Sequence, residues 1–311
     1  MPYLDVGDGH TMYYETHGNP EGIPIVALHG GPGGGMHKWL LDLFDLKKWF
    51  VVLYDQRGCG KSIPRLELKA NTTWKLVGDI EKLRKELEID KWAILGGSWG
   101  TTLAFAYASK HMDKITGFIL RGICLVDDKE LDWMYGSEGA AQVYPKEWKK
   151  FVAVGGPGAA SGRRRNITLA FSKKLANRRT RRRAAAAWWG WESKLSKLHA
   201  SPGTSPGTES HKKFMEEISV LENYYFLHGA WLKPGQLLAA AKKIPASVPV
   251  FLIQGRYDLV CPTRSAFSVA AAIPHSKLIV SEAGHSTFEN KKGIIGAIGE
   301  LYWALSDGRK I

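Results

Sequence analysis

Short apolar segments recur along the first 120 residues, and most of them are followed by glycine and then by a polar or amphipathic stretch. Segments of this length that are rich in Val, Ile, Leu and aromatic residues are typical of buried strands. Their alternation with possible helices predicts a mostly parallel sheet covered by helices. The strands that we expect are 25–28, 50–54, 92–95 and 115–120.

The pattern changes at about residue 127, where Trp, Arg and Ala recur at helical spacings and no convincing strand is found. Strand-like segments return at 250–253 and 277–280, with a helical pattern over 263–272 between them. We therefore predict one α/β core, made of residues 1–126 and 244–311. A helical cap, residues 127–243, is inserted into it.

A serine in a glycine-rich turn is the first candidate for chemistry. Ser98 stands in Gly-Gly-Ser-Trp-Gly, after the strand-like WAIL and before the helix-like TTLAFAYASK. A serine on a sharp strand-to-helix turn is the nucleophile elbow, and small residues at 96 and 100 are needed because the turn is tight. The alternative is a glycine-rich turn with an incidental serine.

Two further residues complete a possible catalytic triad. Asp258 follows the strand VFLI, and His285 follows the strand KLIV. Both are therefore expected at the carboxyl edge of the sheet, where the elbow presents Ser98. The chain order Ser, Asp, His is the order of the α/β-hydrolase fold, in which the imidazole takes the serine proton and the carboxylate orients the imidazole. Each residue alone could be a turn aspartate or a surface histidine.

The segment His-Gly-Gly-Pro-Gly-Gly-Gly, residues 29–35, directly follows the strand IVAL. This fold places the loop that donates one oxyanion N–H at that position, and the residue after the nucleophile donates the second. We therefore assign the oxyanion hole to the N–H groups of Gly31 and Trp99. A phosphate-binding loop was the alternative for Gly60-Lys61-Ser62, but residue 55 is Asp where that motif needs Gly. No cofactor is expected.

The net charge of +13 is concentrated in one part of the chain. Residues 161–199 contain twelve Lys or Arg and a single acid, Glu192. We expect a solvated helix face, with an acidic peptide or nucleic acid as the alternative contact. Nucleic acid is not among the partners that we predict.

The three cysteines, Cys59, Cys124 and Cys261, match no metal-ligand or disulfide spacing, so neither a metal site nor a disulfide is predicted. Residues 1–10 lack the pattern of a signal peptide, and no apolar run approaches the length of a membrane span. We therefore expect a cytoplasmic protein without a membrane segment.

Several motifs together resemble the proline iminopeptidases, or prolyl aminopeptidases. They are HGGPGGG, DQRGCGKS (55–62), GGSWGTTLAFAYA, GRYDLVCP and AGHS, and they occur in the right order and spacing over nearly the whole chain. The resemblance implies a serine aminopeptidase that releases N-terminal proline, or other N-terminal residues as well, from peptides through an acyl-enzyme intermediate. Its partners would be small peptides with a free N-terminus.

The resemblance also implies roles for four residues outside the triad. Glu192 and Glu222 resemble the two cap glutamates that hold the α-amino group of the substrate in related enzymes; otherwise they would be a counter-charge to the arginines and a helix-surface acid. Cys124 and Met134 stand where the family usually has aromatic residues of the proline-ring pocket. We expect a wider, more adaptable pocket here, because methionine is flexible.

Two other functions remain open on the sequence. An esterase or amidase for small neutral substrates would use the same triad with a different cap. A non-catalytic protein that binds acidic partners through its basic cap would keep the fold and lose the chemistry.

Overall fold

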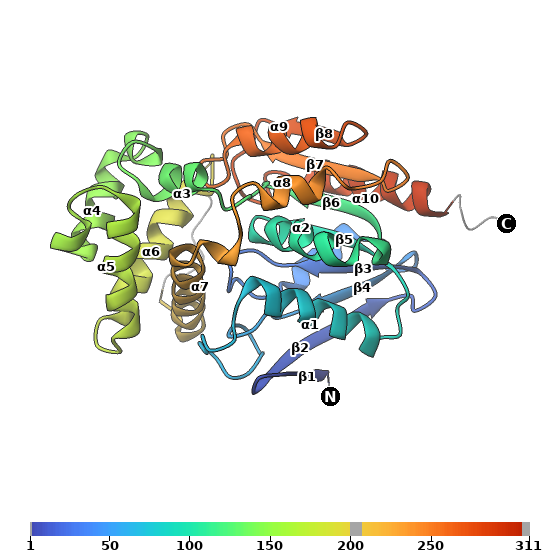
Figure 1. Ribbon diagram of the computed structural model, residues 1–311, viewed down its shortest axis with the longest axis horizontal. Coiled ribbons are helices and arrows are strands. Elements are labelled where there is room, and N and C mark those ends of the chain that lie inside the picture. The colour runs from blue at the N-terminus through green and yellow to red at the C-terminus, as the bar shows by residue number, and fades with distance from the viewer. Residues whose placement is uncertain (1, 200–206, 307–311) are drawn as a thin grey trace.

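The structure is a computed structural model, and it describes residues 2–199 and 207–306. Within these residues, eight strands form one sheet in the order β1-β2-β4-β3-β5-β6-β7-β8. Strands β1 and β2 are antiparallel to their neighbours, and the remaining pairs are parallel. Figure 1 shows the sheet with its covering helices on one side of the molecule and a group of helices, α3 to α7, beside it.

The elements have the following bounds. The strands are β1 (Tyr3–Gly7), β2 (His10–Gly18), β3 (Ile23–Leu28), β4 (Trp49–Tyr54), β5 (Trp92–Gly97), β6 (Ile115–Arg121), β7 (Val250–Gly255) and β8 (Lys277–Ser281). The α-helices are α1 (Thr73–Glu86), α2 (Trp99–His111), α3 (Asp128–Tyr135), α4 (Pro145–Gly155), α5 (Arg164–Ala176), α6 (Arg181–Leu195), α7 (Glu209–Leu227), α8 (Gln236–Ala241), α9 (Thr263–Ala272) and α10 (Lys291–Ser306). Short 3-10 helices are η1 (Lys38–Leu43), η2 (Met112–Lys114), η3 (Ala140–Gln142), η4 (Pro157–Ala159) and η5 (Gly229–Trp231).

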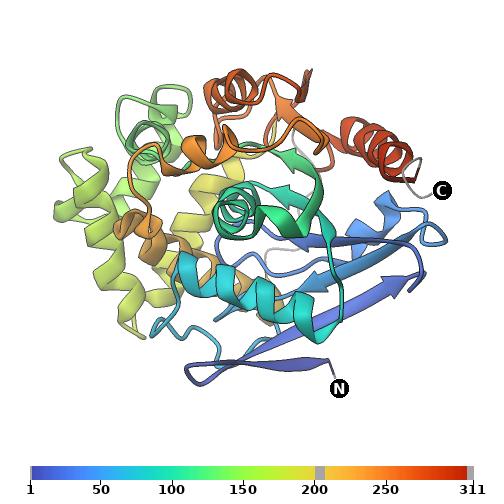
Figure 2. The same cartoon turned by 45° about the vertical axis from the view of Figure 1, so that its right-hand side comes forward.

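The central strands are buried on both faces. In β3, Val26 and Leu28 pack in the core on the side of α1, α2, α8 and α9, whereas Ile25 and Ala27 pack in the core on the side of η1 and α10. This two-sided burial explains why the strands are continuous apolar runs, since successive side chains point to opposite faces. Figure 2 shows α1 and α2 on one face and α10 on the other.

Aromatic side chains form the core of the helical segment α3 to α7. Tyr135 stacks on Trp188 with ring centroids 4.5 Å apart, and Phe151 stacks on Phe171 at 4.6 Å and on Trp191 at 5.8 Å. Such pairs contribute about 0.5–1.5 kcal/mol each beyond area burial. The helical character of this segment is as expected, but the division of the chain into two domains stays a prediction, and α8 packs against α2 and α9.

The six expected strands and the helix 263–272 are present, and each strand extends by one or two residues beyond the predicted bounds. The hairpin β1–β2 was not anticipated. It lies at the edge of the sheet, where Tyr3 is exposed and Val6 and Met12 reach the core. Among the described residues, no helix is long and apolar enough to cross a membrane.

The basic segment lies on exposed faces of α5 and α6 and in the turn between them. Some of its charges have acidic partners: Arg164 pairs with Asp128 and Asp132 at 2.7 and 2.6 Å, and Arg182 pairs with Glu209 and Glu216 at 2.5 and 3.0 Å. Because at least one partner of each pair is largely exposed, each pair contributes little to stability.

Candidate active site

Ser98 lies in the sharp turn between β5 and α2, with backbone angles φ 57° and ψ −125°. This conformation is strained for a residue with a side chain, and such strain is common at functional sites. Close backbone approaches explain the neighbouring glycines. A Cβ at Gly100 would lie 2.0 Å from the carbonyl oxygen of Leu28, and one at Gly96 would lie 2.7 Å from the carbonyl oxygen of Gly100.

His285 and Asp258 form a hydrogen-bonded pair. The Nδ1 atom of His285 lies 2.7 Å from Oδ2 of Asp258, so the carboxylate accepts the Nδ1 proton and leaves Nε2 free to act as a base. The other carboxylate oxygen accepts from the backbone N–H groups of Val260 and Cys261 at 3.0 and 2.8 Å. Gln254 donates to Oδ2 from 3.2 Å. These four contacts fix the carboxylate under the imidazole.

Ser98 and His285 line the same cavity, but no hydrogen bond joins them among the described side chains. The Ser98 hydroxyl lies instead 3.9 Å from the sulfur of Cys261. Catalytic hydrogen bonds are often long or poorly aligned without substrate and close in the substrate complex. The imidazole is nevertheless at the site, because a Cβ at Gly122 would lie 2.9 Å from its Cε1.

The two expected oxyanion donors flank Ser98. Neither the N–H of Gly31 nor that of Trp99 donates to an acceptor within the described part of the chain. A Cβ at Gly30 would lie 3.3 Å from Cβ of Ser98, so the glycine-rich loop approaches the serine closely. Gly31 has φ +106°, a conformation that favours glycine. The assignment of the oxyanion hole to these two N–H groups stays a prediction.

Gln56 connects the oxyanion loop to the elbow, a role that sequence reasoning missed. Its side chain donates to the carbonyl of His29 at 3.0 Å and accepts from the indole N–H of Trp99 at 2.9 Å. Asp55 accepts from the N–H groups of Met36 and Lys61 at 2.7 and 2.8 Å. The motif DQRGCGKS thus supports the oxyanion loop. In the sequence, only its position after a strand could have indicated this role.

Arg121 was also missed as a site residue. Its buried guanidinium donates to the carbonyl oxygen of His285 at 2.6 Å, and its own carbonyl accepts from the N–H of Ser98 at 2.8 Å. Burial lowers the pKa of this guanidinium, and the nearby Asp258 partly offsets the shift. Arg121 therefore positions both the base and the nucleophile.

One buried group of possible metal ligands lies behind the loop: His29, Asp55 and Cys59. Nε2 of His29 already accepts from the N–H of Gln56 at 3.0 Å, and both Asp55 oxygens accept backbone N–H groups. Burial lowers the pKa of His29 to about 4, so the ring is neutral at pH 7. These contacts indicate that the group of three side chains supports the oxyanion loop.

The cavity between the sheet and the helices α6 and α7 has a volume of about 1150 Å³. Glu192 and Glu222 line it together with Ser98, Gly31 and His285. Both expected cap glutamates are thus brought to the same space as the triad residues, from helices that lie far from them in the sequence.

The two glutamates are buried against each other. Glu192 accepts from the hydroxyl of Tyr135, and Glu222 accepts from the indole N–H of Trp188 at 3.0 Å. Burial raises the pKa of Glu222 to about 7, and burial with the neighbouring carboxylate raises the pKa of Glu192 well above its usual range. Two carboxyl groups in contact cannot both ionise easily, so the pair shares a proton at pH 7.

Cys124 and Met134 are not among the residues that line the cavity. The thiol of Cys124 lies 3.9 Å from Oε2 of Glu130, and Cys124 interacts with Cys261, which is next to Ser98. Met134 is buried, and its carbonyl accepts from the indole of Trp191. Their role in a substrate pocket stays a prediction. The side chain of Cys261 lies between Cys124 and Ser98.

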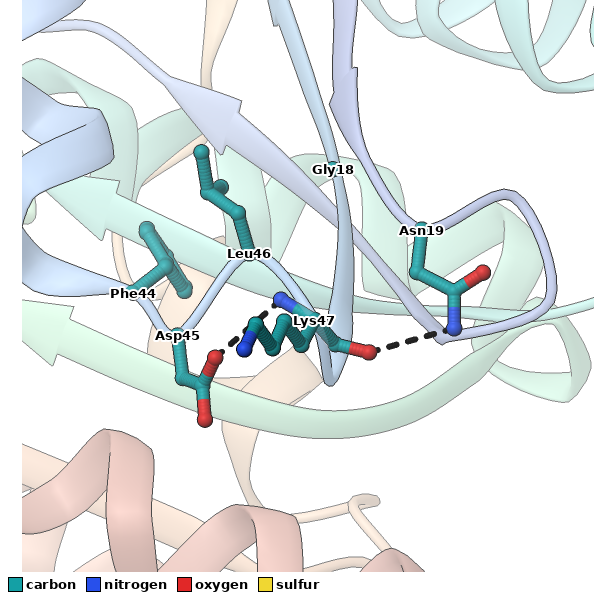
Figure 3. Close-up of a pocket in the computed structure, with 6 residues that line it drawn as sticks. All are labelled: Gly18, Asn19, Phe44, Asp45, Leu46 and Lys47. Atoms are coloured by element: carbon teal, nitrogen blue, oxygen red, sulfur yellow. Dashed lines mark hydrogen bonds between the residues drawn. The ribbon is translucent and has the colours of Figure 1, made fainter.

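A second hollow lies away from these residues. Figure 3 shows it between Gly18, Asn19 and the segment 44–47, where Asn19 donates to the carbonyl of Lys47 at 3.1 Å. β2 ends at Gly18 and β4 begins at Trp49, so the hollow lies at the sheet edge opposite to Ser98. No part of the candidate site lies there.

Comparison with known proteins agrees with this geometry. The α/β hydrolase fold family matches residues 23–292, and the chain therefore has the fold of that class. A solved esterase of Exiguobacterium antarcticum has a TM-score of 0.65 at 20% identity, covering 96% of this chain and 98% of that one. At this identity the likeness concerns the fold alone.

Curated relatives are more specific. The chain is 42% identical over 299 residues to a probable proline iminopeptidase of Leptolyngbya boryana, with 95% of this chain and 90% of that protein covered. It is 38% identical over 289 residues to a proline iminopeptidase of Neisseria gonorrhoeae, with 92% and 90% covered. The chain belongs to the proline iminopeptidase family of α/β hydrolases, and the expected fold class and family are confirmed.

Proposed function

We propose that this protein is a serine aminopeptidase that releases N-terminal proline from peptides. The observation that carries the proposal is the placement of the buried pair Glu192 and Glu222 in the same cavity as Ser98 and His285. A nucleophile and a base make a general hydrolase. Two buried carboxyl groups in the same cavity add a requirement for a free amine on the substrate.

The first step follows from the positions of the side chains. With substrate bound, the Ser98 hydroxyl turns from Cys261 toward Nε2 of His285, which takes its proton as the oxygen attacks the first peptide carbonyl. The developing oxyanion accepts from the N–H groups of Gly31 and Trp99. Loss of one such donor typically costs about 10² to 10³ in rate.

The second step completes the cycle. His285 gives its proton to the departing amine of the second residue, which leaves the prolyl group esterified to Ser98. Water then enters and attacks the ester carbonyl while His285 takes a proton from it. The bond from the acyl carbon to the Ser98 oxygen breaks, His285 returns the proton to that oxygen, and proline is released. Asp258 stabilises the imidazolium in both steps through the 2.7 Å contact.

The glutamate pair supplies selectivity. A protonated secondary amine placed between Glu192 and Glu222 would replace the shared proton and restore two ionised carboxylates around one cation. An acylated N-terminus would leave the pair without a cation, and a buried charge without a partner is costly. Peptides with a free N-terminus are therefore the expected substrates.

A pair of chromogenic substrates tests the proposal: proline p-nitroanilide and its N-acetyl derivative. We expect turnover of the first and at least about a hundredfold lower kcat/KM for the second, in line with an unpaired buried carboxylate. Ser98→Ala abolishes turnover and labelling by a fluorophosphonate.

Two other results would overturn the proposal. Equal turnover of both substrates would indicate a general esterase or amidase. No labelling of Ser98, combined with salt-dependent binding of nucleic acid, would indicate a binding protein instead.

A further inference from the structure

The cavity has two ends of different character, and the helix α7 runs from one to the other. His211, Phe214, Met215, Ile218 and Glu222 all line it, and their spacing places them on one face of the helix. Burial increases along this face. The side chains from His211 to Met215 are partly exposed, whereas Ile218 and Glu222 are buried.

Six aromatic rings line the cavity in two groups, three from α6 and α7 and three from residues 37, 39 and 288. From α6 and α7, Phe214 packs edge-to-face on Trp189 at 4.9 Å and stacks on His211 at 6.2 Å. From the core, Trp39 packs on Phe288 at 4.6 Å. We call these residues, with His37 stacked on Trp39 at 6.2 Å, the ring cluster. All six rings line the cavity.

The ring cluster differs in charge from the inner end. Among the described residues that line the cavity, Glu192 and Glu222 are the only acids. Phe288 keeps 66% of its surface exposed, although a phenylalanine side chain gains free energy when it is covered. It stands three residues after His285, on the loop between β8 and α10. The loop that carries the base thus also carries an uncovered ring.

The oxyanion loop, residues 29–35, contacts α7 between the two ends of the cavity. A Cβ at Gly33 would lie 2.8 Å from Cδ1 of Leu221 and 3.0 Å from the carbonyl oxygen of Glu217. The oxyanion loop therefore touches α7 in the stretch that separates Phe214 from Glu222. A peptide whose amine lies at the glutamates and whose first carbonyl lies at this loop continues toward the ring cluster.

The lengths agree with this path. Phe214 and Glu222 are eight residues apart, which is about 12 Å along a helix. An extended dipeptide spans about 7 Å of backbone, and a large side chain on the second residue adds about 5 Å. The second side chain therefore reaches the rings when the amine is at the glutamates.

We infer that the ring cluster is the binding site for the second residue of the peptide, and that it favours a large apolar or aromatic side chain there. The inference rests on the proposed aminopeptidase function, because that function fixes the amine and the carbonyl. The cavity then sets specificity at two positions, by charge at the first residue and by apolar contact at the second.

The test compares two dipeptide amides, Pro-Phe-NH₂ and Pro-Gly-NH₂, by kcat/KM. We expect a preference of at least about tenfold for Pro-Phe-NH₂, since its phenyl group is removed from water by the rings and the glycine peptide has no side chain to bury. In Phe288→Ala and in Trp39→Ala this ratio falls at least about threefold. Phe267→Ala, which removes an exposed ring on α9, is the matched control and keeps the wild-type ratio.

Binding separates the inference from the proposed function. In Ser98→Ala, calorimetry with the same two amides measures affinity without turnover, and Pro-Phe-NH₂ is expected to bind more tightly. If wild type hydrolyses neither amide, the aminopeptidase function is wrong, and this affinity ratio still tests the ring cluster. Equal kcat/KM for both amides, or ratios unchanged in both ring variants, would overturn the inference.

Discussion

The glutamate pair gives the sharpest prediction for activity. In Glu192→Gln the side chain keeps its volume, and its remaining oxygen can still accept from Tyr135, so the cavity keeps its shape. What is lost is one of the two negative charges around the substrate amine. In Glu222→Gln the same holds, provided that the amide oxygen faces the indole of Trp188.

The magnitude follows from the contact that disappears. A hydrogen bond to a charged group contributes about 1.5–3 kcal/mol. At about 1.4 kcal/mol for each factor of ten, either variant loses between about 10-fold and 150-fold in kcat/KM. The loss is confined to substrates with a free amine, because an acylated substrate never used the charge.

The assay is hydrolysis of proline aminomethylcoumarin by wild type, Glu192→Gln and Glu222→Gln. Glu216→Gln is a matched control, since this residue lies on the same helix α7 but pairs with Arg182 outside the cavity. It should keep kcat/KM within about twofold, because its partner Arg182 is exposed and such ion pairs contribute little. Wild-type kcat/KM in both cavity variants would refute the amine-binding role.

Three further predictions concern stability and geometry. Because burial raises the folded-state pKa of Glu192, its protonated form stabilises the fold at low pH, and this contribution is lost as pH rises. The difference in melting temperature between Glu192→Gln and wild type, measured by calorimetry, should therefore grow from pH 5 to pH 9, and a constant difference would contradict the pKa shift. Gly100→Ala should destabilise the fold by at least about 2 kcal/mol in denaturant titration, because the new Cβ meets the carbonyl oxygen of Leu28; wild-type stability would show that the elbow relaxes freely. Asp258→Asn should lower kcat by about 10⁴ by stabilising the wrong tautomer of His285, with unchanged circular dichroism; a loss under tenfold would exclude the orienting role.

The fold and the three triad candidates could be predicted because each depends on local pattern. Strands that are buried on both faces are written as apolar runs, and a residue directly after such a run lies at a known edge of the sheet. Ser98, Asp258 and His285 all satisfy this rule. Local pattern does not encode side-chain rotamers, so it could not predict that the Ser98 hydroxyl faces Cys261.

The supporting residues could not be predicted because their roles depend on which strands are neighbours. Gln56 follows β4 and contacts residues after β3 and β5, and Arg121 ends β6 and contacts the loop after β8. The local sequence pattern does not give the order of the strands in the sheet, in which β4 lies beside β3 and β8 beside β7. The ring cluster has the same origin, since its rings come from η1 and the residue before it, from α6 and α7, and from the loop after His285.

The cap glutamates fall between these cases, because helical periodicity held a signal for them. Glu192 is four residues after Trp188 and Glu222 is four after Ile218, so each acid lies on the apolar face of its helix. The signal is not specific, however, since Glu130 and Glu217 are buried on helices as well. Glu217 pairs with Arg65, whereas Glu130 accepts from Ser265 and the N–H of Leu125. An acid at an apolar helical position therefore predicts a buried carboxyl group. Only its contacts distinguish a structural role from a binding site for a cationic group.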